Sequence, residues 1–250
     1  MNVFNELSGD DYRERFQEPE QQFYAAITSQ LACYPVKSTI LDIGTGPGTI
    51  AELANAAGLE LDILGIEPSN LVDDAAELAK QEGKVLYTPK KGDMMQAPTA
   101  FELTLGSLHG LTLLRSAHEI AKSMGGKTAF YNGLGNLLQY SAIGGQVIIA
   151  DPCYAPHIRV DIEGNQEIIR ATREILDELI NHSDPPENLF SPRELIMAMG
   201  DLGCEIAYIQ SIPAQNIPPL LEQKYGITVS RSPKEFFVAR FEKVTEGALA

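Results

Sequence analysis

The sequence predicts an α/β protein built on a doubly wound, mostly parallel sheet. Short apolar segments with the composition of buried strands alternate along the chain with segments whose apolar residues recur at helical spacing. Such alternation is typical of a parallel sheet covered by helices on both faces. The last two predicted strands follow each other without a helix between them, which indicates one antiparallel strand at the end. With 250 residues, the chain is long enough for a single domain with a large core.

The first half of the chain supplies three predicted strands, and each of the first two runs into a helix. The strands lie at 38–43, 61–66 and 84–88, and the helices at 48–57 and 70–81. In the first helix the apolar residues fall on one face, and Gly58 marks its end. The residues before the first strand are helical in character and carry an aromatic stripe of Phe16, Phe23 and Tyr24.

The second half supplies four predicted strands, at 101–107, 146–150, 204–211 and 235–241. Two helices, at about 111–124 and about 133–142, fill the long interval between the first two of these strands and are separated by Gly125-Gly126. A third, amphipathic helix covers 166–181. Ser191-Pro192-Arg193-Glu194 is a capping box with proline at the first helical position, and it predicts a helix that runs to about residue 202.

The most informative segment is Ile40-Leu-Asp-Ile-Gly-Thr-Gly-Pro-Gly48, where an apolar strand runs into three glycines at alternate positions. A glycine turn lets the backbone approach a ligand closely, because there is no Cβ and positive φ costs little. Asp42 places a carboxylate near this turn, which disfavours a phosphate and favours a ligand that is positively charged or donates hydrogen bonds. The segment also lacks the Gly-Lys-Ser/Thr ending of a P-loop and the G-x-G-x-x-G spacing of the dinucleotide fingerprint.

A second acid, Glu67, closes the second strand in Gly65-Ile66-Glu67-Pro68-Ser69. An acid at that place can accept hydrogen bonds from the hydroxyls of a ribose. Together, the two segments resemble the first two motifs of the class I S-adenosylmethionine (SAM) dependent methyltransferases. The resemblance covers roughly residues 38–241. It implies a seven-stranded sheet of order 3-2-1-4-5-7-6, with the last strand antiparallel and helices on both faces.

By this resemblance, SAM is the expected cofactor. Asp93, which follows the third strand, is implied to accept a hydrogen bond from the adenine amino group, and Glu67 is implied to bind the ribose. Ser107 is implied to line the methionine end. The residues that the resemblance assigns to the cofactor are Asp42, Gly44, Thr45, Gly46, Gly48, Glu67, Pro68, Asp93, Met94 and Ser107.

Methyl transfer from a sulfonium needs alignment of nucleophile, methyl and sulfur, and a general base only where the nucleophile is protonated. The expected catalytic candidates lie past the ends of the predicted strands, where ligands bind in such sheets, and are His109, Asp151, Tyr154 and His157. His118 is expected on a solvated helix face and His182 at a helix end. The four histidines show no zinc-ligand spacing, and Asp151 alone fits the clustered acids of the magnesium-dependent relatives, so no metal is predicted.

Two segments are expected to add to the basic sheet. Residues 1–35 are predicted to form an N-terminal helical lid, because such a segment closes the acceptor pocket in relatives that the chain resembles. Residues 36–245 form the SAM-binding domain, with a helical insertion at about 125–144. This insertion carries Leu134, Leu137, Leu138 and Tyr140, which suggest a small apolar or aromatic acceptor.

Charge and cysteine content restrict the partners and the compartment. With 34 acids against 19 bases, the net charge is −15, which disfavours nucleic acids and anionic membranes as partners. Cys33, Cys153 and Cys204 are scattered and are typical of reduced thiols. No signal peptide is recognised and no apolar run approaches the ~18 residues of a membrane span. A cytoplasmic location is therefore expected, and a homodimer is left open.

The leading hypothesis is an enzyme that transfers a methyl group from SAM to O, N or C of a small organic acceptor. A SAM-binding module, or an inactive partner subunit without methyl transfer, is the alternative. An NAD-linked oxidoreductase is disfavoured by the glycine spacing and by Asp42.

Overall fold

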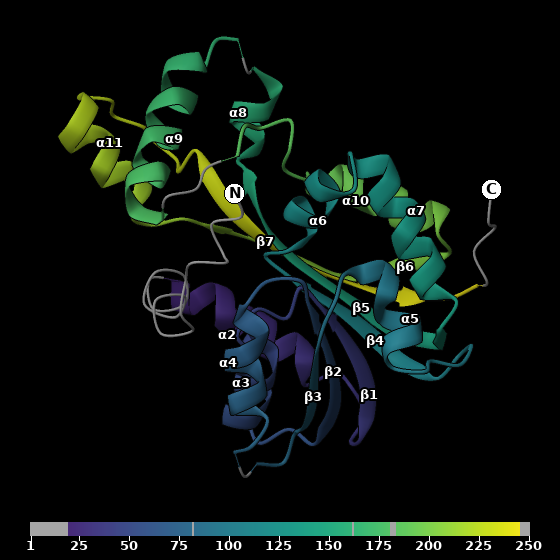
Figure 1. Cartoon of the computed structure of the whole chain (residues 1–250). Helices are drawn as coiled ribbons and strands as arrows, with labels where there is room; N and C mark the ends of the chain where they lie inside the picture. Colours follow the sequence, from purple (N-terminus) through teal and green to yellow (C-terminus); the bar gives the residue numbers. More distant parts are fainter. Residues whose placement is uncertain (1–19, 82, 162, 181–183, 246–250) are drawn as a thin grey trace.

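The structure of the protein is a computed structural model that describes residues 20–81, 83–161, 163–180 and 184–245 (Figure 1). Seven strands form one sheet in the order β3-β2-β1-β4-β5-β7-β6, which confirms the expected order. The strands are β1 (Ser38–Ile43), β2 (Leu61–Glu67), β3 (Leu86–Lys91), β4 (Leu108–Leu114), β5 (Ser141–Tyr154), β6 (Cys204–Pro213) and β7 (Lys234–Lys243).

The first five strands are parallel to one another, whereas β7 is antiparallel to both of its neighbours, β5 and β6. Because β7 is reversed, its first residue, Lys234, pairs with Tyr154 at the end of β5. The start of β7 therefore lies at the carboxyl edge of the sheet, together with the ends of the parallel strands.

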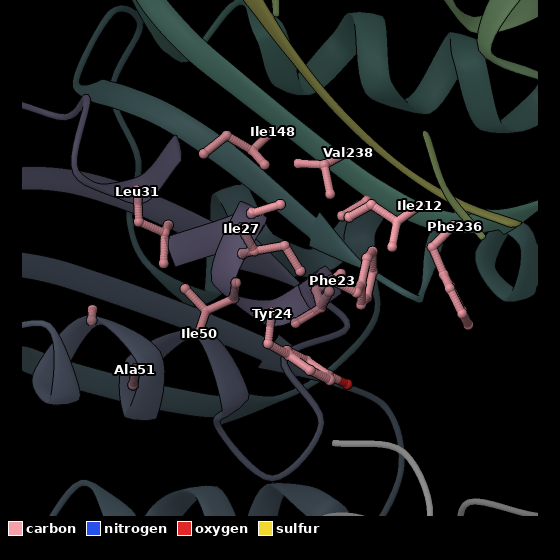
Figure 2. Close-up of a cluster of buried hydrophobic side chains, with 14 of the residues drawn as sticks. Phe23, Tyr24, Ile27, Leu31, Ile50, Ala51, Ile148, Ile212, Phe236 and Val238 are labelled. Atoms are coloured by element: carbon pink, nitrogen blue, oxygen red, sulfur yellow. The ribbon is translucent and has the colours of Figure 1, made fainter. Parts of the chain in front are cut away.

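One face of the sheet is covered by α2 (Gln21–Leu31), α3 (Thr49–Ala56), α4 (Leu71–Leu78), α9 (Gln166–Ile180) and α11 (Ile217–Tyr225). Figure 2 shows side chains of α2, among them Phe23 and Ile27, next to Ile148, Phe236 and Val238 of the sheet. The Phe23 and Phe236 rings lie 4.8 Å apart between centroids.

The opposite face is covered by α5 (Ala97–Ala100), α6 (Ala117–Ser123), α7 (Lys127–Leu138) and α10 (Pro192–Asp201). Strand β1 serves both cores, since Ile40 faces the first layer of helices while Leu41 and Ile43 face the second. Two shorter helices, η4 (Met94–Gln96) and α8 (Pro156–Val160), follow β3 and β5. Both faces of the central strands are thus buried, as a doubly wound sheet requires.

The fourth strand lies later in the chain than predicted. Strand β4 covers Leu108–Leu114, so the predictions of a strand at 101–107 and of a helix that begins at 111 are wrong. From Gly110 to Leu114 every residue of β4 is buried, as suits a strand covered on both faces. Gly110 permits its close approach to β5, because a Cβ there would clash with the carbonyl oxygen of Gln146. The helix that follows, α6, begins only at Ala117.

A further difference is helix α11, which lies between β6 and β7 where no helix was predicted. Its sequence begins Ile217-Pro218-Pro219, and prolines are tolerated in the first turn of a helix, where no intrahelical donor is lost. By contrast, the capping box at the start of α10 is confirmed. The Ser191 hydroxyl accepts from the backbone N–H of Glu194 at 3.2 Å.

The predicted lid and insertion are in part core elements. Residues 1–19 lie outside the described residues, and with them Phe16; the helix that follows, α2, buries Phe23, Ile27 and Leu31 against the sheet. Helix α7, in the predicted insertion, buries its leucines in the core of the other face. Because these leucines are buried in the core, their apolar character by itself does not indicate an apolar acceptor.

Candidate functional site

The glycine turn after β1 has the backbone conformation that only glycine adopts readily. Gly44, Gly46 and Gly48 have φ of +69°, +55° and +96°. A Cβ on Gly44 would lie 2.6 Å from the Cβ of Ser116, and a Cβ on Gly48 would lie 2.6 Å from Leu78, whereas a Cβ on Gly46 would meet nothing within 4 Å. Gly44 and Gly48 therefore serve packing, and Gly46 is the position at which the turn borders open space.

Glu67, at the end of β2, lies directly beside this turn. Its carboxylate accepts a hydrogen bond from Gly46 N at Oε2 and another from Ser69 N at Oε1, both at 2.9 Å. Each carboxylate oxygen has a second lone pair, so Glu67 retains capacity to accept from a hydroxyl group. Pro68, the next residue, is exposed at the same edge.

Asp42 is buried and faces the interior of the protein. Its carboxylate accepts from the hydroxyls of Thr45, at 2.6 Å, and Thr112, at 2.7 Å. The Tyr87 hydroxyl lies 2.8 Å from the Thr45 hydroxyl and extends this network to β3. Burial raises the pKa of Asp42 to about 6, against the opposing effect of the two hydroxyl donors. Asp42 and Thr45 thus brace the turn from behind.

Asp93 and Met94 lie at the carboxyl end of β3, next to Glu67 along the edge of the sheet. The backbone N–H of Gly92 donates to the carbonyl oxygen of Glu67 at 3.1 Å, which joins the two strand ends. Asp93 is exposed and caps the short helix η4, whereas Met94 is buried. The structure therefore gathers the predicted cofactor residues of β1, β2 and β3 at one edge.

Ser107 and His109 are not gathered with them. Because β4 begins at Leu108, both residues lie at its amino end, on the opposite edge of the sheet. The Nδ1 atom of His109 accepts from the backbone N–H of Thr39, near the start of β1, at 3.0 Å. Their predicted roles at the cofactor and acceptor depended on the misplaced fourth strand and are corrected here.

The residues that follow the carboxyl end of β4 are instead Arg115, Ser116 and His118. The Ser116 hydroxyl donates to the carbonyl oxygen of Ile43 at 2.8 Å, which ties the start of α6 to the glycine turn. Arg115, with a φ of +54°, pairs with Glu20, and its guanidinium lies 5.3 Å from the ring centroid of Phe236. Lys234, the first residue of β7, is buried near Arg115, and its burial lowers its pKa to about 8.

His118 is buried, so the prediction that it lies on a solvated helix face is wrong. Asp151 of β5, which has no exposed surface, contacts His118 through both of its carboxylate oxygens. Oδ1 of Asp151 lies 2.9 Å from His118 Nδ1, and Oδ2 accepts from the His118 backbone N–H at 3.0 Å. A fourth strand placed at 108–114 would have revealed this pair. His118 then follows the carboxyl end of that strand and lies beside Asp151 of β5.

The other two catalytic candidates lie near this pair in the chain but differ in burial. Tyr154, at the end of β5, is fully buried and donates from its hydroxyl to the carbonyl oxygen of Asp184 at 3.5 Å. His157 lies on α8 and is exposed. His182 lies outside the described residues.

Comparison with known proteins by sequence finds no match, neither to a family model nor to a curated protein. Comparison of structures finds many. A SAM-dependent methyltransferase from Aquifex aeolicus is 15% identical, with a TM-score of 0.52 over 92% of this chain and 93% of that one. A geranyl diphosphate methyltransferase in complex with SAM is 13% identical, with a TM-score of 0.57 over 90% and 86%. The MccD protein is 14% identical, with a TM-score of 0.61 over 90% and 98%.

Among the described residues, no helix is both long and apolar enough to cross a membrane. The strand order, the reversed β7 and the similarity to these structures agree with one another. The chain has the fold of the class I SAM-dependent methyltransferases.

Proposed function

We propose that this protein is a methyltransferase that binds SAM at the carboxyl edge of β1, β2 and β3 and methylates O, N or C of a small organic acceptor. The observation that carries the proposal is the contact between Glu67 and Gly46. It places a carboxylate with spare acceptor capacity beside a backbone position that borders open space, as a nucleoside ligand requires.

The residues at this edge fit the parts of the cofactor in turn. Glu67 is suited to accept from the ribose hydroxyls, and the exposed Asp93 to accept from an adenine amino group. At Gly46 the main chain could lie directly against the ligand, because no side chain is in the way. When bound, SAM supplies a methyl group that is already activated as a sulfonium.

The acceptor is proposed to bind past the ends of β4 and β5. There the chain has to orient the nucleophile in line with the methyl group and keep water away. Of the expected catalytic residues, the exposed His157 is proposed to contact the acceptor. Asp151 and Tyr154 have no exposed surface and are proposed to position their neighbours in this half of the site, as Asp151 positions His118. An acceptor of small size is consistent with the acidic net charge of −15, which opposes a nucleic acid substrate.

The test has two stages. Calorimetry with SAM, with its demethylated product S-adenosylhomocysteine and with NAD should give saturable binding for the first two ligands only. Transfer of a labelled methyl group from SAM should then be measured over a panel of small hydroxyl, amine and carbon acids. Tight SAM binding without transfer to any acceptor would favour the alternative of a SAM-binding subunit, and NAD binding would contradict the proposal.

A further inference from the structure

Three side chains with metal-ligand chemistry meet next to the His118–Asp151 pair. They are His118 and Glu119 from α6 and Asp184 from the segment that precedes α10. The Nε2 atom of His118 lies 3.6 Å from Oε1 of Glu119 and 3.6 Å from Oδ2 of Asp184. One ligand atom from each residue lies within 4.8 Å of the other two, and the side chains of His118 and Asp184 are buried.

These distances suit an ion better than a hydrogen bond. At 3.6 Å, the nitrogen and oxygen atoms are too far apart for a good hydrogen bond, which lies at about 2.7–3.2 Å. Ligands at about 2.0–2.2 Å from a tetrahedral zinc ion lie about 3.4 Å from one another. The two edges that meet at His118 Nε2 therefore have nearly the length of the edges of a coordination tetrahedron.

Asp151 orients the imidazole for this role. In the tautomer that the proposal uses, Asp151 accepts from Nδ1–H, and Nε2 is the ring nitrogen that faces Glu119 and Asp184. An imidazole whose far nitrogen bonds a carboxylate is the common arrangement behind a metal-ligating histidine. Asp151 also fixes the backbone of His118, so the ring is held in place at both ends.

Lys122 lies beside the two carboxylates. Its ammonium is 3.3 Å from Asp184 and 4.0 Å from Glu119, and its side chain is half exposed, so it can turn toward solvent. An ammonium at this place offsets part of the negative charge that a bound dication would neutralise. Lys122 is thus expected to compete with a metal ion for Asp184.

We propose that His118, Glu119 and Asp184 bind one divalent transition-metal ion, with Asp151 as the residue that orients His118. One imidazole and two carboxylates suit Zn²⁺, Co²⁺ or Mn²⁺ better than Mg²⁺ or Ca²⁺, which prefer oxygen ligands alone. This site goes beyond the proposed function. Sequence spacing did not predict it, because Asp184 comes from a distant part of the chain.

The test uses the tag-free chain after treatment with a chelator, with no SAM or acceptor present. Calorimetry with Zn²⁺ and visible absorption with Co²⁺ should both give one equivalent of bound ion. His118→Ala and Glu119→Gln should each weaken binding at least tenfold, and Asp151→Asn should weaken it about 10- to 100-fold, the usual effect of an orienting residue. Lys122→Met should tighten binding severalfold. His109→Ala, which removes an exposed histidine at the opposite edge, is the matched control and should leave affinity unchanged.

The proposal is overturned if no saturable binding of either ion is seen. It is also overturned if Glu119→Gln and His118→Ala bind both ions as the wild type does, because the ions would then be bound elsewhere. Circular dichroism shows whether each variant is folded. Glu119 is partly exposed, so its variant keeps the test decisive even if the buried His118 does not tolerate replacement.

Discussion

The backbone N–H of Gly46 and the carboxylate of Glu67 are joined by a hydrogen bond of 2.9 Å, which connects the turn after β1 to the end of β2. The two motifs that identify a nucleoside site in the sequence are therefore one unit in the structure. Glu67 shapes the turn and, in the proposed complex, also binds the ribose.

Replacement of Glu67 by alanine tests this double role. Glu67→Ala removes an ionised acceptor, so the binding free energy of S-adenosylhomocysteine should weaken by about 1.5–3 kcal/mol. Calorimetry measures it. Glu77→Ala, at an exposed position of α4 with a side chain 72% exposed, is the control and should bind as the wild type does. Equal affinity in the two variants would remove Glu67 from the site.

A valine at Gly46 tests whether the open space at the turn is ligand space. Gly46→Val and Gly58→Val are matched, because both glycines have positive φ and a Cβ on either would meet nothing within 4 Å. Both variants should lose about 1–3 kcal/mol of stability from backbone strain. Only Gly46→Val should also lose cofactor binding, and similar binding by both would show that the turn does not contact the ligand.

The buried Asp42 predicts a specific dependence of stability on pH. The pKa of Asp42 is about 6 in the folded protein, whereas its ordinary value of 3.8 applies in the unfolded chain. The folded protein therefore binds this proton more tightly than the unfolded chain does. The stabilising effect is complete below pH 4 and is lost as pH rises through 6, at a cost of about 3 kcal/mol. Urea unfolding of the wild type and of Asp42→Asn, which does not titrate, isolates this contribution. A constant difference between the two from pH 4 to 7 would contradict the buried position of the carboxyl.

Helix α2 is predicted to be essential for folding. Phe23→Ala should destabilise the protein by about 3–5 kcal/mol, because the ring is enclosed against Tyr24 and Phe236. Gln22→Ala, at an exposed position of the same helix, should have little effect in the same unfolding experiment. Truncation to residue 34 should then abolish folding.

Removal of residues 1–19 alone tests the lid, and a folded chain with reduced methyl transfer is expected.

His109→Ala should leave methyl transfer unchanged, since His109 lies at the amino end of β4 and bonds the backbone of Thr39. The rates and pH profiles of the variant and the wild type on an identified acceptor provide the measurement. A loss of turnover with unchanged cofactor affinity would return His109 to the acceptor site.

The local parts of the fold could be read from the sequence, and the non-local parts could not. Strand β1, the glycine turn and α3 are recognisable because their signals lie within one short segment, residues 38–56. The fourth strand was ambiguous, since both 101–107 and 108–114 are rich in apolar residues. In the structure, Leu108–Leu114 is the strand, because Leu111 pairs with Leu41 of β1 and with Val147 of β5 in the sheet. No local pattern reveals such pairing between distant residues.

The same error displaced half of the candidate site. With the fourth strand placed at 101–107, His109 was expected to follow its carboxyl end and His118 to lie on a solvated helix face. With the strand at Leu108–Leu114, His109 lies at its amino end, and His118, in the first turn of α6, follows its carboxyl end. The inward direction of Asp42 could not be predicted either, because its partner Thr112 belongs to that strand.

The Ser116 hydroxyl donates a hydrogen bond to the carbonyl oxygen of Ile43, and Gly44 packs against the same side chain. This contact connects the half proposed for the donor to the half proposed for the acceptor. A change at this contact would therefore be expected to affect both halves of the proposed site. Helix α8, which carries the exposed His157, takes no part in this contact and can vary without disturbing it.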